Sequence, residues 1–162
     1  MTEKLIELKM DLQRFARSKN ALTEYYVADL PESPETEPDW KRLAKYISSV
    51  PDETDEETED TAYYDGDGTP ETDVMSVKKG FTFEGLRDPE DEAQNLVAER
   101  EMTVGDDRKI MLKQVRPNGD VFQGRATATE IIVSGGDASE YQPFECTLTW
   151  DRLPVKEEVP AG

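Results

Sequence analysis

Histidine is absent from the sequence, and cysteine occurs only once, at Cys146. Without histidine the chain lacks the commonest general base, the Ser-His and Cys-His nucleophile pairs and the usual ligand of zinc sites. A single cysteine cannot form a disulfide within the chain, which favours folding in a cytosol over folding in an oxidising compartment. These shortages predict a protein that is not an enzyme and that needs no cofactor.

Long hydrophobic runs and basic runs are missing as well. No apolar stretch approaches the roughly 18–20 residues of a membrane span, and the first residues lack the apolar centre of a signal peptide. No run of Lys and Arg is present that could hold nucleic-acid phosphates or anionic lipid. We therefore expect a soluble protein that binds neither a membrane nor nucleic acid.

Hydrophobic residues are scarce, at 35% of the 162 residues. A chain of this length fits one domain with extensions, since single cores of roughly 100–150 residues are the common case. The low apolar content predicts a core that is small or shared with neighbouring subunits. Such a core is consistent with sheets whose edges are completed by other copies of the chain.

Acidic residues are abundant and unevenly placed. The formal net charge is −18, of which residues 1–29 contribute zero, residues 30–75 contribute −12 and residues 76–162 contribute −6. The most acidic stretch is DETDEETEDTAYYDGDGTPETD at 52–73, with 11 carboxylates and no base among its 22 residues. Three interpretations are open: a metal site, a disordered acidic tract, or a surface that repels another molecule.

A calcium site is the most specific of these interpretations. If Asp65, Asp67 and Gly68 took the third, fifth and sixth positions of an EF-hand loop, Tyr63 and Val74 would occupy the first and twelfth, where carboxylates are required. The EF-hand register therefore fails at both ends. Other calcium geometries leave Asp65 and Asp67 as weak candidate ligands. A glycosidase carboxylate pair is disfavoured, because solvated like charges do not raise the pKa of a catalytic acid.

The two halves of the acidic stretch differ in composition. DETDEETED indicates a solvated loop. The second half, TAYYDGDGTPETDV, is more typical of a contact surface, because Tyr63 and Tyr64 supply contact area with polar tips. We therefore predict one long acidic loop over 52–73 whose tyrosine-bearing part touches another molecule.

The N-terminal third predicts an arm and a tether. Residues 1–28 are interpreted as an arm, with an amphipathic helical seam at Leu5, Leu8, Leu12 and Phe15. A helix this short is marginal alone, so the arm is expected to order on a partner, the alternative being a frayed chain end. Residues 29–39, with Pro31, Pro34 and Pro38 among acids, are interpreted as an extended tether.

The remaining chain, residues 40–155, predicts a strand-rich domain, followed by a tail at 156–162. Strands are predicted within 40–50 and 74–84, the second with Val77, Phe81 and Phe83 on one side. A strand predicted over 144–150 alternates apolar and polar residues, and its apolar face carries Phe144, Cys146, Leu148 and Trp150. Cys146 is therefore interpreted as a small core residue rather than a reactive thiol.

One helix and one hairpin complete the predicted domain. Asp88 as cap and Pro89 as first residue predict a helix over 89–101, packed through Ala93, Leu96 and Val97. Asn118-Gly119 between two strand-like segments predicts a β-hairpin with a type I′ turn, in which both residues take positive φ.

Three phrases together resemble a known family. They are DWKRLAKYISSVPDETDEETEDTAYYDGDGTPETDV, GFTFEGLRDPEDEAQNLVAE and VRPNGDVFQGRATATEI. Over roughly 40–155 the chain resembles the major tail protein, or tail tube protein, of long-tailed non-contractile bacteriophages of low-GC Gram-positive bacteria. DLQRFA at 11–16 is similar to the opening hexapeptide of many structural proteins of such phages, although nine residues here precede Met10.

This resemblance implies a fold and a function. The implied fold is mainly β, with two packed antiparallel sheets in a sandwich or barrel-like tail tube arrangement, one flanking α-helix and the N-terminal arm. The implied function is structural: hexameric rings stack into a tail tube that conducts DNA during ejection, and its lumen is expected to be anionic. The implied partners are copies of the chain itself, the tape-measure protein, the tail initiator or distal tail protein, and the tail terminator.

The resemblance also implies a location in the virion tail, after assembly in the cytoplasm of the bacterial host. Residues expected to make subunit contacts are Phe15, Trp40, Tyr63, Tyr64 and Asp65. Two competing functions remain open. One is a calcium-dependent extracellular β-sandwich binding module, and the other is a related tail component that forms a single ring, such as a terminator.

Overall fold

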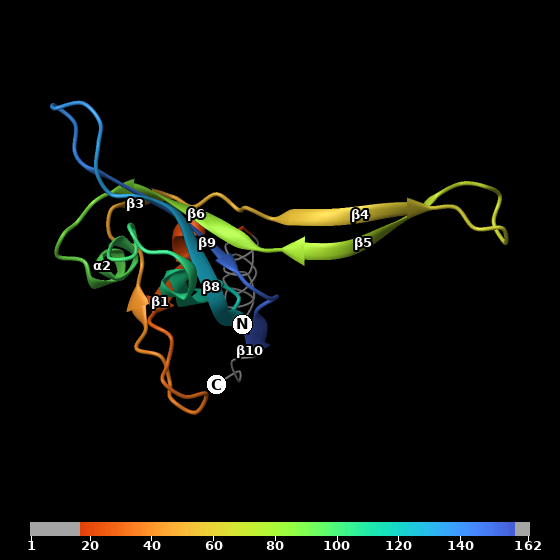
Figure 1. The fold of residues 1–162 in the computed structure, drawn as a ribbon, viewed down its shortest axis with the longest axis horizontal. Coiled ribbons are helices and arrows are strands. Elements are labelled where there is room, and N and C mark those ends of the chain that lie inside the picture. The colour runs from red at the N-terminus through yellow and green to blue at the C-terminus, as the bar shows by residue number, and fades with distance from the viewer. Residues whose placement is uncertain (1–16, 158–162) are drawn as a thin grey trace, which may run out of the picture.

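The computed structural model describes residues 17–157, and over this range the protein is mainly antiparallel β-structure with one α-helix (Figure 1). The predicted fold class is thus confirmed, with one large curled sheet and one small sheet. The strands of the large sheet are β1 (Glu24–Ala28), β2 (Lys41–Arg42), β3 (Ile47–Ser49), β6 (Gly80–Leu86), β7 (Lys109–Val115), β8 (Val121–Ile132), β9 (Pro143–Trp150) and β10 (Val155–Glu157). The other elements are β4 (Asp55–Thr61), β5 (Glu71–Lys78), the α-helix α2 (Glu92–Ala98) and the 3₁₀ turns η1 (Asn20–Leu22) and η2 (Gly105–Arg108).

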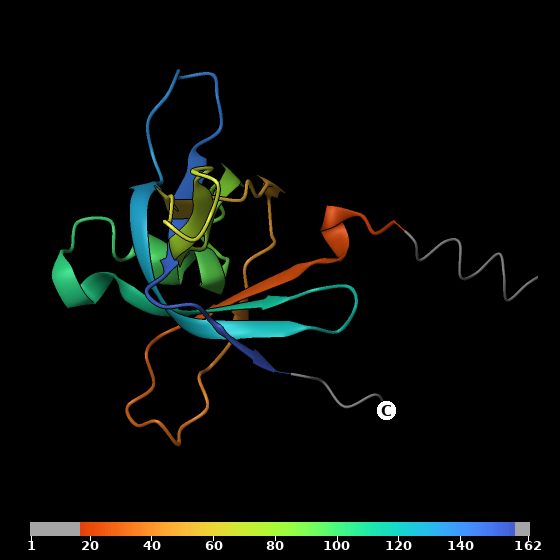
Figure 2. The ribbon, with the colours of Figure 1, turned by 90° about the vertical axis from the view of Figure 1, so that its right-hand side faces the viewer.

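The large sheet has the strand order β2-β1-β7-β8-β9-β6-β3, and β10 pairs with the first residues of β8. Strand β8 is long and strongly bent, so its first half pairs with β10 and its second half with β9 along the same edge (Figure 2). The β8–β9 register shifts between Thr129 and Ile132, where Glu130 has a φ of 51°. A bulge of this kind bends a strand and lets the sheet curl around its own core.

The core lies on the concave face of the curled sheet and under α2. In β9 the predicted alternation is confirmed, because Phe144, Cys146, Leu148 and Trp150 are buried and the residues between them are not. The Cys146 thiol is fully buried, and burial raises its pKa far above the ordinary value, so a reactive thiolate is not formed. The largest fully buried side chains include Phe83, Phe144, Ile110 and Leu112.

The N-terminal boundary differs from the prediction. Residues Glu24–Ala28, assigned from sequence to the arm, form β1 between β2 and β7, and Val27 and Ala28 are fully buried. The folded domain therefore begins well before residue 40. The segment EYYVA is not recognisable as a strand from the sequence, because five residues are too few to show a clear alternation of apolar and polar side chains. The predicted helical seam at Leu5, Leu8, Leu12 and Phe15 lies outside the described residues.

One segment, residues 41–53, closes both margins of the large sheet. Its first residues pair with β1 as β2, and its later residues run along β6 as β3, continued by a bridge between Asp52 and Phe81. Backbone hydrogen bonds from Leu86 to Tyr46 and from Thr82 to Pro51 extend this pairing. The strand predicted over 40–50 is thus two short strands. The margins of β1 and β6 that we expected other copies to complete are covered by the chain itself.

The helix α2 is shorter than the predicted range 89–101. Its cap is Asp91, whose carboxylate accepts a hydrogen bond from the Gln94 amide, whereas Asp88 accepts one from the Glu90 amide in the preceding turn. The predicted apolar stripe at Ala93, Leu96 and Val97 is buried, and it packs against β1 and β8. In residues 17–157 no helix has the length and apolar character needed to cross a membrane.

The hairpin at Asn118-Gly119 is confirmed, but its turn is not of type I′. Gly119 has a φ of 95°, whereas Asn118 is not among the residues with positive φ. The Gly119 amide donates to the Arg116 carbonyl, and the Arg116 amide donates to the Asp120 carbonyl. This is a type I turn closed by a glycine bulge, which suits Pro117 at its second position because proline fixes φ near the required value.

The predicted long acidic loop at 52–73 is instead a β-hairpin. Its strands β4 and β5 pair in register from Asp55 opposite Lys78 to Thr61 opposite Glu71, with one bulge. The predicted strand over 74–84 is therefore split between β5 and β6 at Lys79. β-branched residues in both strands favour the paired ladder in spite of the like charges, because strand preference depends on cross-strand partners more than on local composition.

Candidate assembly surfaces

The β4–β5 hairpin stands away from the rest of the molecule (Figure 1). Its side chains alternate between two faces. One face carries Asp55, Glu57 and Glu59 on β4 and Glu71, Asp73, Ser76 and Lys78 on β5. We name this the acidic face. The opposite face carries Glu56, Thr58 and Asp60 with Thr72, Val74 and Val77, so it is mixed in character.

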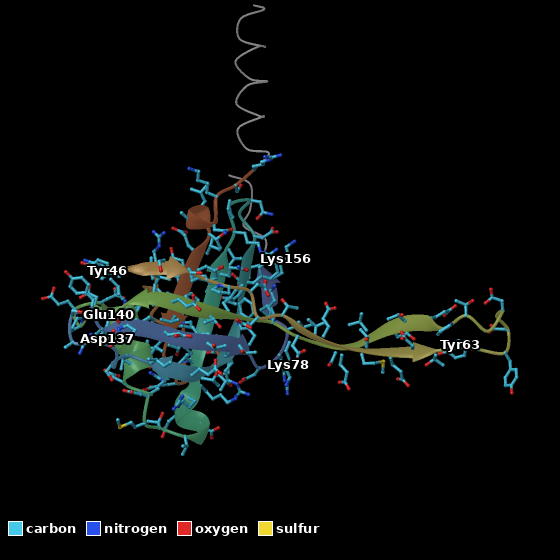
Figure 3. The ribbon with its side chains drawn as sticks, turned by 90° about the horizontal axis from the view of Figure 1, so that it is seen from above. Tyr46, Tyr63, Lys78, Asp137, Glu140 and Lys156 are labelled. Atoms are coloured by element: carbon cyan, nitrogen blue, oxygen red, sulfur yellow. The ribbon has the colours of Figure 1, made fainter. Side chains whose placement is uncertain are left out.

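The tip of the hairpin brings three of the predicted contact residues together. Tyr63, Tyr64 and Asp65 follow β4, and Figure 3 places Tyr63 at the end farthest from the sheet. The Tyr63 side chain is 53% exposed, and Tyr64 is fully exposed. A tyrosine that is solvated in the single chain offers apolar area to a second molecule.

The weak calcium candidates lie in the same tip. Asp67 accepts a hydrogen bond from the Thr69 amide at 2.9 Å, and the hydrogen bonds from Thr69 hold the pKa of its carboxyl below the usual range. Among residues 17–157, no three His, Cys, Asp or Glu side chains gather as they would around a metal ion. Asp65 and Asp67 thus form part of an exposed turn.

Trp40, another predicted contact residue, packs within its own chain. The Lys113 ammonium lies 4.6 Å from the centre of the Trp40 ring and 4.7 Å from that of Tyr26. Burial lowers the pKa of Lys113, although the carboxylates of Glu37 and Glu157 act against this. The cation–π contact fixes the end of the 29–39 segment on the sheet. Phe15 lies outside the described residues.

The convex face of the sheet carries hydroxyls and carboxylates. Thr82 on β6 and Thr147 on β9 lie within hydrogen-bond distance, at 2.9 Å between their hydroxyl oxygens. The Thr82 hydroxyl also lies 3.0 Å from the Glu53 carboxylate, and the Thr147 hydroxyl lies 3.3 Å from the Glu130 carboxylate. Because each hydroxyl has one proton, the two threonines donate two hydrogen bonds among these three contacts. This polar group spans β6, β9 and β8. Glu84 and Glu145 lie directly opposite each other along the same strand pair.

A cluster of bases surrounds one carboxylate where the hairpin joins the sheet. Lys109 and Arg125 both pair with Asp151, at 3.0 Å and 2.9 Å. Lys78 and Arg152 line the same surface hollow of about 420 Å³, and within residues 17–157 neither of them forms an ion pair. We name Lys78, Lys109, Arg125 and Arg152 the basic cluster. Its four bases and one acid give a local formal charge of +3 in a chain of net −18.

Burial by itself would raise the pKa of the Asp151 carboxyl. Hydrogen bonds from Thr127, Lys109 and Arg125, with the charge of Lys109, outweigh burial and lower that pKa below the usual range. A lowered pKa in the folded state stabilises the fold above the unfolded value near 3.9, and this stabilisation disappears as the pH falls through the folded value.

Replacing Asp151 with asparagine is therefore expected to destabilise the fold by about 1 kcal/mol at neutral pH, with less effect in acid. Urea unfolding of both proteins from about pH 7 down to about pH 2 measures this difference. As control we choose Asp137→Asn, because Asp137 is exposed and has no ion pair in the described range. A D151N deficit that stays constant with pH would contradict the assigned role of Asp151.

Sequence reasoning missed three features. The basic cluster joins residues from β5, β7, β8 and the turn after β9, so no local run reveals it. Gln94 is fully buried on α2, and a lone glutamine in a helix carries no signal of burial. The pairing of 41–53 with both sheet margins depends on tertiary structure alone.

No protein-family model matches the sequence, and no curated protein is significantly similar to it. Solved structures do contain similar folds. A chain in the virion of a native gene transfer agent particle is 13% identical, with a TM-score of 0.63 over 87% of this chain and 99% of that chain. A chain in the tail of an empty gene transfer agent particle, refined with C6 symmetry, is 12% identical, with a TM-score of 0.63 over 88% and 99%.

A third similar chain belongs to the PVC sheath–tube complex of an extracellular contractile injection system in its extended state. It is 15% identical, with a TM-score of 0.53 over 93% of this chain and 97% of that chain. The protein therefore has the fold of phage tail and tube components, as the resemblance in sequence predicted.

Proposed function

We propose that the protein is a tail tube subunit of a siphophage-type virion or of a phage-derived particle, and that its role is structural. The observation that carries this proposal is the fold that it shares, over nearly its whole length, with a chain of a sixfold-symmetric tail. The sequence resemblance to major tail proteins of phages of Gram-positive bacteria supports the same function independently. In this proposal six copies form a ring, and the rings stack into a tube.

The convex face of the sheet is the surface proposed to line the lumen. Its threonines and glutamates are polar, and the exposed apolar side chains beside them, Leu86 and Ile132, lie at one end of the strands. Carboxylates at Glu84, Glu130 and Glu145 would repel the phosphates of passing DNA. Screening limits that repulsion to roughly 8 Å at physiological salt, so the wall would resist adhesion without closing the channel.

The hairpin is the surface proposed to join copies. It is ordered as a ladder whose main contacts within residues 17–157 are between its own two strands, and its tip exposes Tyr63 and Tyr64. Exposed tyrosines with polar tips are typical of contact surfaces. Tyr63, Tyr64 and Asp65 are thus proposed subunit contacts, together with Phe15. Trp40 supports assembly by fixing the 29–39 segment.

Assembly of such a tube needs partners that set its length and its ends. We assign these roles to a tape-measure protein within the tube, an initiator or distal tail protein at one end and a terminator at the other. Assembly in the host cytoplasm agrees with the single buried cysteine, which needs no oxidising compartment. The mature location is the virion tail.

Electron microscopy of the concentrated protein tests this proposal. We expect hollow tubes or stacked rings from the complete chain, and none after replacement of residues 56–77 by an Asn-Gly turn. The shortened chain should keep its melting temperature within about 3 °C, because the hairpin contributes little burial to the core. As a finer test, Tyr63→Ala with Tyr64→Ala should weaken stacking, and unchanged polymerisation would remove the tip from the contact.

Two other results would replace the proposal. Monomers whose melting temperature rises with calcium would favour the calcium-dependent binding module, since a ligand of the folded state must stabilise it. Rings that never stack would favour a terminator-like component that forms one ring. The metal interpretation rests on Asp65 and Asp67, so D65N with D67N should abolish any calcium effect.

A further inference from the structure

The basic cluster is an exception in a strongly acidic molecule. Asp151 is shared by Lys109 and Arg125, and the Arg125 side chain is still 56% exposed. Lys78 and Arg152 have no anionic partner within residues 17–157 and open onto the same hollow. Exposed charges of one sign around a concave surface favour binding of an anion.

The acidic face of the hairpin has the complementary excess. It carries five carboxylates, Asp55, Glu57, Glu59, Glu71 and Asp73, and one lysine, Lys78, a formal charge of −4. Glu59 on β4 lies directly opposite Asp73 on β5. Like charges in directly opposed positions destabilise a strand pair, so a cation brought against them would stabilise the hairpin.

Asp55 lies directly opposite Lys78, but the hairpin of one molecule cannot place Glu59 and Asp73 on its own basic cluster. Lys78 ends β5 at the root of the hairpin, and Figure 3 shows the hairpin running outward from there to Tyr63. Glu59 is four residues beyond Asp55, about 13 Å at the rise of a β-strand. This exceeds the screening length of about 8 Å at physiological salt.

We infer that the basic cluster of one copy receives the acidic face of the hairpin of a second copy. This inference rests on the proposed self-assembly and adds the surface that accepts the hairpin. The basic cluster lies at the base of the hairpin, whereas Glu59 and Asp73 lie in its middle. The contact therefore joins two different surfaces of identical chains, so it is heterologous and repeats from copy to copy. A heterologous contact builds rings or open-ended assemblies rather than closed dimers.

A nucleic-acid backbone is the other anion that a basic surface can bind. The hairpin is favoured for two reasons. The cluster has a carboxylate, Asp151, at its centre, and its four bases stand within a chain of net −18 that repels polyphosphate over longer range. The acidic face of the hairpin presents carboxylates of opposite sign to the cluster, and complementary charges at an interface set register and partner choice.

An exchange of charges between the two surfaces tests the inference. Lys78→Glu with Arg152→Glu should raise the protein concentration needed for assembly by about tenfold or more, the scale of losing one close interfacial charge pair. Glu59→Lys with Asp73→Lys should do the same. All four substitutions in one chain should bring this concentration back to within about threefold of wild type.

The hairpin offers a matched control. Glu56→Lys with Asp60→Lys changes the net charge equally but lies on the opposite face of β4. This control should neither weaken assembly as strongly nor be corrected by reversal of the cluster. Equal loss in the control, or failure of the fourfold variant to recover, would overturn the inference. Retention of binding to a DNA duplex only in chains with an intact cluster would assign the cluster to DNA instead.

Crosslinking separates this inference from the proposed function. A Glu59→Cys chain is mixed with an Arg152→Cys chain, and a short bismaleimide should join them at least about tenfold faster than it joins Glu56→Cys to Arg152→Cys. The native Cys146 is buried and does not compete. Crosslinking without tubes would keep the inference and reject the tube. Tubes without selective crosslinking would keep the proposed tube and reject the inference. The absence of both tubes and selective crosslinking would reject both.

Discussion

Replacement of Gly85 by alanine is expected to lower the free energy of unfolding by about 3 kcal/mol or more. A Cβ at Gly85 would lie 2.0 Å from the Tyr46 carbonyl oxygen and 2.8 Å from the Ile47 Cα. Both neighbours are backbone atoms, so no side chain can turn aside. The Tyr46 carbonyl also accepts the Leu86 amide at 3.0 Å, and movement of the 41–53 segment would break this bond.

Urea unfolding of wild type and Gly85→Ala measures the effect. Gly124→Ala is the matched control, because its added Cβ would meet the Trp150 ring at 3.5 Å, an ordinary contact. The control should change stability by less than about 1 kcal/mol. A Gly85→Ala protein as stable as Gly124→Ala would show that the 41–53 segment is not held against β6 as described.

Replacement of Gln94 by leucine is expected to destabilise the fold by about 3 kcal/mol. The Gln94 side chain is fully buried, and its amide nitrogen donates to the Lys45 and Leu86 carbonyls at 2.9 and 3.0 Å. Its oxygen accepts the Asp88 amide at 2.7 Å. Leucine has a similar volume but leaves these backbone groups without their partner, and buried unsatisfied groups are costly.

The same urea assay measures this change, and Gln142→Leu serves as control because the Gln142 side chain is exposed. We expect a control effect below about 0.5 kcal/mol. Loss of the Gln94 bonds should also loosen the 41–53 segment, since Lys45 lies within it. Faster amide exchange at Leu86, whose amide binds Tyr46, would report this directly. Similar stability of both variants would reduce Gln94 to a packing residue.

The parts of the fold that could be predicted are those encoded locally. The alternation in β9 is regular over eight residues, so the buried positions follow from the period of a strand. Gly119 marks its turn because few other residues accept a φ of 95°. The stripe on α2 likewise follows from helical spacing, although Asp91 rather than Asp88 caps it.

The parts that could not be predicted depend on partners distant in sequence. β4 consists mostly of carboxylates, and only its pairing with β5 makes it a strand. β1 is short, and its place in the sheet, next to the edge strand β2, comes from pairing with β7, 87 residues later by the Tyr26–Lys113 register. The contacts expected at Tyr63, Tyr64 and Trp40 stay predictions; the two tyrosines are exposed at the hairpin tip, and the Lys113 ammonium lies over the Trp40 ring.

The closure of both sheet margins by residues 41–53 bears on how the chain avoids fibre formation. Unpaired strand edges template the stacking of identical chains, and natural proteins suppress this by covering edges or charging them. Here the covered margins leave the hairpin as the long exposed ribbon, and its carboxylates oppose the parallel, in-register stacking that amyloid requires. The carboxylates that we infer to select the neighbouring copy would thus also oppose misassembly of the hairpins.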